Sequence, residues 1–130
     1  GFTDLLLDDN PYIIQEFIKE VDEGDKRIII LNGEPLGAIL RIAKEGSFIC
    51  NFHSGGTPRA TTISEQDSYI CSTIKDFLID NEIFFAGIDI IGEKLTEINI
   101  TSPTCVQEIN FANGVKLEEN VLDFILNKIN

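Results

Sequence analysis

Basic residues are scarce in this chain of 130 residues, which has 10 lysines and arginines against 22 aspartates and glutamates and a net charge of −12. A chain with this charge repels a partner whose surface is negatively charged. The composition therefore argues against nucleic acid or an anionic membrane as a partner. For the same reason the chain would repel a nucleoside triphosphate ligand unless cations bind with it.

Cysteine and histidine are scarce too, with three cysteines (Cys50, Cys71 and Cys105) and a single histidine, His53. The cysteines are odd in number and lack the spacing of a metal site, so we expect buried, reduced thiols. A lone histidine without a base partner is more often structural than catalytic. The sequence contains no signal peptide and no apolar stretch long enough to cross a membrane, from which we expect a cytoplasmic location.

Hydrophobic residues make up 43% of the chain and charged residues 25%, which is ordinary for one globular domain. Apolar periodicity and turn residues predict an α+β fold, an antiparallel sheet of hairpins with helices packed on one face. Ser64 and Asp67 have the spacing of a capping box that opens a helix. The expected strands are 12–18, 26–31, 36–42, 84–91 and 95–101, and further helices are expected at 3–9, 103–110 and 117–129.

Asn32 and Gly33 form the strongest short hairpin signal in the chain. A strict two-residue turn at this point would place Arg27 and Arg41, on the two flanking strands, on opposite faces of the sheet. Both arginines can reach one ligand only if the returning strand contains a bulge. Pro35 and Gly37 make such a bulge plausible.

A second hairpin carries polar residues where apolar ones are expected. We predict a three-residue turn, 92–94, which sets Asp89 opposite Glu97 and Gly87 opposite Asn99, so that three oxygen-bearing side chains share a face. Two carboxylates and an amide oxygen are ligands suited to Mg²⁺, or to Mn²⁺. Because the two carboxylates would repel each other, removing either charge need not destabilise the fold. The alternative is a solvated outer face with ordinary polar residues.

Several runs of the sequence resemble one known family. The runs 89–92 and 95–105 closely resemble the end of the ATP-grasp domain of bacterial glutathione synthetase, and 24–27 and 32–35 match it in the same order. The resemblance covers most of the chain, about residues 12–110. The run Thr96–Thr104 is specific to that family, whereas the spacing of Asp89, Glu97 and Asn99 alone would indicate only ATP-grasp enzymes in general.

The resemblance implies the second half of an ATP-grasp fold and the ATP-dependent joining of γ-glutamylcysteine and glycine through an acyl phosphate. It further implies that residues 1–130 form one domain, the C-terminal part of a longer enzyme that is homo-oligomeric when complete, and that this part is inactive alone. The residues implied are Gln15, Glu16, Phe17, Ile18, Asp25, Arg27 and Arg41 for ATP, with the two arginines catalytic; Asn51, Gly55, Gly56, Thr101 and Ser102 for substrate; and Asp89, Glu97 and Asn99 for metal.

The long loop from Lys44 to Thr62 lacks periodicity, and the resemblance implies a lid over the reacting phosphate. The family typically has arginine where this chain has Ile49, so the lid lacks an expected cation. Two alternatives stay open. Because the metal residues alone do not discriminate among ATP-grasp enzymes, one is another ATP-grasp ligase that joins amino acids or peptides. Because of the missing lid arginine, the other is a non-catalytic nucleotide-binding module.

Overall fold

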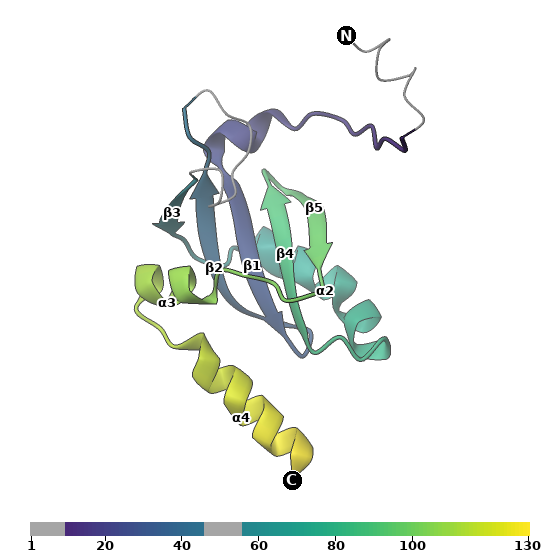
Figure 1. Cartoon of the computed structure of the whole chain (residues 1–130), viewed down its shortest axis with the longest axis vertical. Helices are drawn as coiled ribbons and strands as arrows, with labels where there is room; N and C mark the ends of the chain where they lie inside the picture. The colour runs from purple at the N-terminus through teal and green to yellow at the C-terminus, as the bar shows by residue number, and fades with distance from the viewer. Residues whose placement is uncertain (1–9, 46–55) are drawn as a thin grey trace.

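The computed structural model describes residues 10–45 and 56–130. In chain order its elements are the 3-10 helix η1 (Lys19–Glu23), β1 (Asp25–Leu31), β2 (Glu34–Ile42), β3 (Thr57–Ala60), α2 (Glu65–Asp80), β4 (Phe85–Ile91), β5 (Lys94–Asn99), α3 (Val106–Asn113) and α4 (Leu117–Ile129). The strands form an antiparallel sheet in the order β3-β2-β1-β4-β5 (Figure 1). The predicted α+β class is confirmed.

The first hairpin has the predicted turn and the predicted bulge. Leu31 pairs with Glu34, and the two turn residues Asn32 and Gly33 have φ values of 51° and 78°, the left-handed pair that such tight turns require. Between Ile29 and Ile30 the register shifts by one residue. The shift brings the side chains of Arg27 and Arg41 to the same face, because each extra residue reverses the alternation of all that follow.

The second hairpin reaches the predicted register by a different route. The predicted three-residue turn is wrong: Ile91 pairs with Lys94, which leaves a two-residue turn, and Gly92 adopts a φ of 59°. A register shift between Asp89 and Ile90 then adds one residue, so Asp89 still lies opposite Glu97. The shorter turn and the added residue cancel, and the expected polar face survives.

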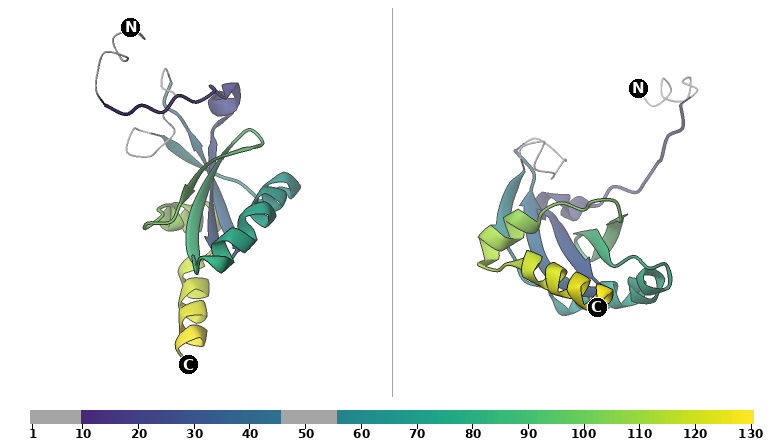
Figure 2. Two further views of the ribbon diagram at one scale, coloured as in Figure 1. Left: turned by 90° about the vertical axis from the view of Figure 1, so that its right-hand side faces the viewer. Right: turned by 60° about the horizontal axis from the view of Figure 1, so that its bottom comes forward.

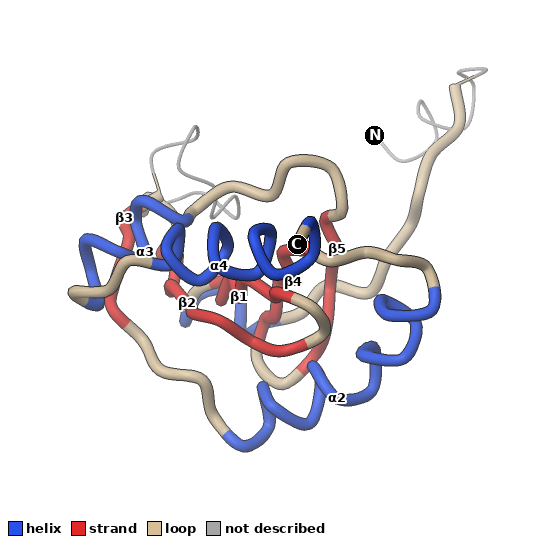
Figure 3. The backbone as a smooth tube through the Cα atoms, turned by 90° about the horizontal axis from the view of Figure 1, so that it is seen from below, coloured by secondary structure: helices blue, strands red, loops and turns tan. Residues whose placement is uncertain are grey.

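Helices cover both faces of the sheet, so the predicted packing on one face is wrong (Figures 2 and 3). Strand β1 has four consecutive buried residues, and alternation directs them to two opposite sides. Ile28 packs in the cluster that includes Leu78 of α2, whereas Ile29 packs with Ile109 of α3 and Leu117 of α4. A strand that is apolar on both faces needs cover on both.

The predicted start of α2 and the predicted bounds of α4 are confirmed, whereas the predicted start of α3 is wrong. Ser64 caps α2 as predicted, with its Oγ accepting from Asp67 N at 3.1 Å and Asp67 Oδ2 accepting from Ser64 N at 2.8 Å. Helix α4 has the predicted bounds. Helix α3 begins at Val106 rather than at Pro103, because Cys105 has a φ of 93° that no helix admits.

The predicted buried strand over residues 12–18 is wrong. These residues are outside the sheet, and Ile13 and Phe17 are 88% and 60% exposed. The segment leads away from the sheet toward the N-terminus (Figure 1). The helix predicted over residues 3–9 lies outside the described residues.

Candidate functional site

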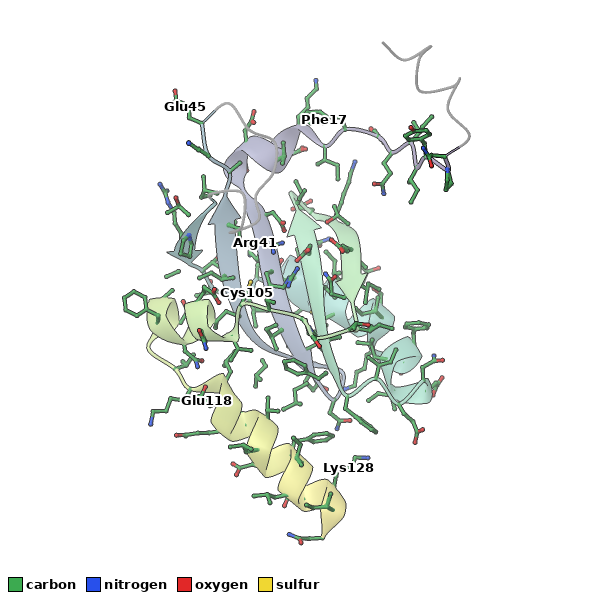
Figure 4. All side chains as sticks on the ribbon, viewed as in Figure 1. Phe17, Arg41, Glu45, Cys105, Glu118 and Lys128 are labelled. Carbon is green, nitrogen blue, oxygen red and sulfur yellow. The ribbon has the colours of Figure 1, made fainter. Side chains whose placement is uncertain are left out.

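Four charged side chains gather on the sheet face that α3 covers: Asp25, Arg27, Arg41 and Asp89. Strand β1 lies between β2 and β4, so Asp25 stands opposite Arg41 and Arg27 stands opposite Asp89. The two arginines and Asp89 are only 4–6% exposed. Buried charges are tolerated when they pair with each other, and each of these does. Figure 4 shows Arg41 over the middle of the sheet.

Asp89 is the centre of this cluster. Arg27 donates from Nε to Asp89 Oδ1 and from Nη2 to Oδ2 at 2.9 Å, a two-pronged contact between guanidinium and carboxylate. Arg41 Nη2 lies 3.0 Å from Asp89 Oδ1 and donates to Asp25 Oδ2 at 2.5 Å. Both oxygens of Asp89 are therefore paired with arginine. The expectation that its charge can be removed without destabilising the fold rested on repulsion from Glu97, and that premise is wrong, because the charges in contact with Asp89 are positive.

The pKa values of the two aspartates shift in opposite directions. Burial and the nearby Asp89 carboxylate raise the pKa of Asp25 from 3.8 to about 6, against the attraction of Arg41. Burial would also raise the pKa of Asp89, but hydrogen bonds and charge attraction from Arg27 and Arg41 outweigh it and hold that pKa below its usual value. Asp89 is the firmly ionised member of the cluster.

Glu97 and Asn99 extend the cluster along β5. With its amide oriented to suit both neighbours, Asn99 donates to Glu97 Oε1 at 3.0 Å and accepts from Arg27 Nη2 at 3.2 Å. Glu97 itself is exposed. The structure thus brings Asp89, Glu97 and Asn99 to one face, with Arg27 in contact with two of them.

The donor set of these three residues fits Mg²⁺ in kind, because two carboxylates and an amide oxygen are hard oxygen ligands. In residues 10–45 and 56–130, however, no three His, Cys, Asp or Glu side chains gather closely enough to hold a metal ion by themselves. Mg²⁺ commonly binds through one or two carboxylates together with substrate phosphates and water. The arrangement fits a cation that arrives with phosphate oxygens better than one that binds alone.

A groove of about 550 Å³ lies where β4 ends, and none of the four cluster residues is among the residues that line it. One wall comes from the segment before η1 and the other from the hairpin of β4 and β5, including Ile91, which pairs with Asp25 across the sheet. The predicted nucleotide residues Gln15, Glu16, Phe17 and Ile18 all line it, together with Val21, Ile91, Lys94, Leu95 and Thr96. The last five were not predicted: Val21 lies in η1 and the other four in the hairpin of β4 and β5, and no local pattern distinguishes them from other residues of those elements.

Comparison with known proteins decides the family. Residues 4–114 match the family "Prokaryotic glutathione synthetase, ATP-grasp domain". The chain belongs to this family.

Curated relatives in the prokaryotic glutathione synthetase family are much longer than this chain. It is 45% identical to the glutathione synthetase of Thermosynechococcus vestitus over 115 residues, which are 88% of this chain and 36% of the relative. It is 44% identical to that of a Nostoc species, with the same coverage, and 41% identical to that of Agrobacterium fabrum over 91% of this chain and 37% of the relative. The chain thus spans little more than a third of these relatives.

The segment after β5 crosses the ATP-grasp sheet above the charged cluster. The carbonyl oxygen of Thr104 accepts from Arg27 Nη1 at 3.3 Å. A Cβ on Gly87 would lie 2.8 Å from Pro103 Cβ and 3.3 Å from Arg27 Cδ, so glycine permits this close crossing. Thr101 and Ser102, predicted to contact substrate, are exposed at the start of the crossing. Sequence reasoning missed the carbonyl of Thr104, because a backbone contact leaves no trace in residue type.

The structure describes some of the remaining predicted residues and not others. Gly56 directly precedes β3, while Ile49, Asn51 and Gly55 lie outside the described residues. Cys71 and Cys105 are buried free thiols, as predicted, and Cys50 is outside the described residues too. Of the helices in the described ranges, none combines the length and apolar character needed to cross a membrane.

Proposed function

We propose that this chain is the C-terminal ATP-grasp part of an enzyme that joins γ-glutamylcysteine to glycine with the conversion of ATP to ADP and phosphate. The observation that carries the proposal is the buried cluster of Arg27, Arg41 and Asp89 on one face of the sheet, in a chain of this family. Two guanidinium groups on one face suit a ligand with several phosphate oxygens.

In this reaction the C-terminal carboxylate of γ-glutamylcysteine attacks the γ-phosphorus of ATP, and ADP leaves. The acyl phosphate so formed is attacked at its carbonyl carbon by the amine of glycine, and inorganic phosphate leaves as the amide bond forms. Such chemistry asks the protein mainly to position the reactants and neutralise charge. Arg27 and Arg41 act on the phosphate oxygens, where their planar forks match two oxygens at once.

We assign the other predicted residues to the adenine, the ribose, the metal ion and the peptide substrate. Residues 15–18 contact the adenine, since they line the groove, and Asp25 lies near the ribose, since it adjoins the groove through Ile91. Asp89, Glu97 and Asn99 hold Mg²⁺ or Mn²⁺, which when bound supplies positive charge to the phosphates. The substrate residues are Thr101, Ser102 and Gly56, with Asn51 and Gly55 from the undescribed loop.

The longer relatives contain further residues with which this chain would act. We infer that it works together with an N-terminal part that the longer relatives contain, in a homo-oligomer, and is inactive without that part. The buried free thiols Cys71 and Cys105 are consistent with a reducing cytoplasm, where ATP is also available.

The test is phosphate release from ATP by the enzyme that contains this chain, measured with and without γ-glutamylcysteine and glycine. We expect release to require both substrates and to yield glutathione in equal amount. Arg27→Lys keeps the charge but loses the fork, so it should lower turnover by at least about tenfold. The exposed Arg59 gives the matched control, Arg59→Lys, which should leave turnover unchanged. Equal turnover with an unrelated acceptor, or none with these substrates, would refute the assignment.

A further inference from the structure

The two buried arginines of the cluster are held unequally. Arg41 contacts two carboxylates, with Nη2 at 2.5 Å from Asp25 Oδ2 and 3.0 Å from Asp89 Oδ1. Among the described residues Arg27 contacts a single carboxylate, Asp89, and its other partners there are neutral oxygens of Thr104 and Asn99. The difference arises from strand order, because Asp25 lies directly opposite Arg41 on the neighbouring strand.

The different numbers of carboxylate partners have a consequence when a cation binds Asp89. Any cation that engages the Asp89 oxygens competes with both arginines, because both contact Oδ1. Among the described residues, Arg27 then loses its one carboxylate partner and becomes free to turn to another anion. Arg41 still has Asp25 as a partner. The Nε of Arg41 is buried and has no hydrogen-bond partner among the described residues, so Nη2 is the atom through which Arg41 is held.

We propose that Asp25 is a positioning residue for Arg41: it fixes the guanidinium of Arg41 on the binding face while Asp89 is engaged elsewhere, and thereby leaves Arg27 as the arginine that moves. The proposal rests on the function proposed above, since it takes phosphate oxygens as the anions that the arginines meet. It differs from the expected role of Asp25 near the ribose, because the oxygen concerned is Oδ2, which already contacts Arg41.

The protonation behaviour of Asp25 supports this role. Burial raises the pKa of Asp25 to about 6, so its charged form is less favourable in the folded protein than in water. Against the lowering effect of burial, the same carboxylate helps to raise the pKa of Arg41 above its usual value, so its favourable interaction is with Arg41. Its Oδ1 is buried and has no hydrogen-bond partner among the described residues, which leaves Oδ2 as the oxygen that acts on Arg41.

The chain offers a direct measurement, because it has three arginines, Arg27, Arg41 and Arg59. Each gives one Nε–H signal by NMR, and the rate of hydrogen exchange with water reports how firmly that guanidinium is held. Asp25→Asn keeps the size and one acceptor oxygen but removes the charge. At pH 7.5 we expect Arg41 to exchange about tenfold faster in this variant, with Arg27 unchanged. The exposed Arg59 exchanges fast in both proteins and serves as the internal control.

A second variant, Asp89→Asn, imitates the loss of the shared carboxylate. With Asp25 intact, we expect Arg27 to exchange fast and Arg41 to stay slow, and adding Asp25→Asn should release Arg41 as well. Fast exchange of Arg41 in Asp89→Asn alone would overturn the proposal. If Asp89→Asn does not fold, the Asp25→Asn variant alone tests the proposal. An unchanged exchange rate of Arg41 Nε–H in Asp25→Asn would overturn it.

Calorimetric titration of Mg²⁺ with ATP into the enzyme that contains this chain separates the two proposals. If Asp25 were merely an acidic neighbour, Asp25→Asn would strengthen phosphate binding by removing a repulsive charge. Positioning predicts the opposite sign, a loss of about tenfold in affinity. Equal or tighter binding by the variant overturns the positioning role and leaves the proposed function standing. Absence of binding by the unaltered enzyme refutes the function, while the exchange rates still decide the positioning role.

Discussion

Replacing Asp89 with asparagine should destabilise the folded chain, although it removes a negative charge from a chain with a net charge of −12. The side chain of Asp89 is buried, and both of its oxygens contact guanidinium groups. Asparagine keeps one acceptor oxygen, but its amide nitrogen is a donor and would face another donor. Arg27 and Arg41 would stay buried with a single aspartate, Asp25, between them.

The magnitude follows from the hydrogen bonds that asparagine cannot accept. Asp89 Oδ1 meets Nε of Arg27 and Nη2 of Arg41, and Oδ2 meets Nη2 of Arg27. The asparagine oxygen can replace Oδ1, but its NH2 group cannot accept from Nη2 of Arg27, so one hydrogen bond to a charged group is lost, at roughly 1.5–3 kcal/mol, and the other two lose their ionic character. Removing one partner of a buried ion pair typically costs about 3–5 kcal/mol, so we expect a loss of about 4 kcal/mol. Since small domains are stable by about 5–15 kcal/mol, the destabilisation is a large part of the total.

Urea unfolding at pH 7.5 measures this destabilisation. With an unfolding slope of about 2 kcal/mol per molar urea, a loss of about 4 kcal/mol lowers the midpoint by about 2 M. The matched control is Glu97→Gln, which removes the same charge from an exposed side chain on the opposite strand and should change stability by less than about 0.5 kcal/mol. Equal midpoints for Asp89→Asn and the unaltered chain would refute the inference that arginine pairing holds this face together.

Three further perturbations test the fold. Ser64→Ala removes one half of the capping box and should lower stability by about 1 kcal/mol in thermal unfolding, whereas Ser72→Ala, exposed on the same helix, should change it by less than about 0.5 kcal/mol. Ile88→Ala empties a fully buried position and should cost about 2–5 kcal/mol in urea unfolding, while Ile13→Ala, on an exposed side chain, should cost little; equal effects would contradict the core assignment. The pKa of Asp25 is about 6 in the folded chain against 3.8 as the ordinary value, so the folded state binds the proton more tightly. The contribution of Asp25 to stability therefore falls as pH rises from about 4 to about 6, and Asp25→Asn should gain stability relative to the unaltered chain between pH 4.5 and 7; parallel curves would contradict the raised pKa.

Features that depend on neighbours in sequence could be predicted from the sequence. The turn at Asn32 and Gly33 requires residues that accept positive φ, and the cap at Ser64 requires an oxygen before the first helical turn, so both signals are local. The bulge after Ile29 was predictable for another reason, because Pro35 and Gly37 disturb a regular ladder.

Features that depend on strand order could not be predicted from the sequence in the same way. Arg27 lies opposite Asp89 because β1 pairs with β4, and these residues are separated by 62 positions in the chain. No local pattern specifies that pairing, so Asp89 was predicted to meet Glu97 and not arginine. The cover on both faces of β1 was missed because apolar alternation shows that a face is buried but does not identify the helix that buries it.

Under the proposed function, the charge balance of the cluster accounts for an acidic chain that binds an anionic nucleotide. Asp25, Arg27, Arg41 and Asp89 sum to zero, and at physiological salt charges beyond about 8 Å are largely screened, so the net charge of the whole chain matters little at this face. With both aspartates paired, the arginines attract a phosphate weakly. Once a cation neutralises Asp89, Asp25 is the remaining negative charge among these four residues and it contacts Arg41 alone, so the positive charge of Arg27 is no longer balanced. Under the proposed function, phosphate and cation therefore favour each other's binding, and neither gains much from the cluster alone.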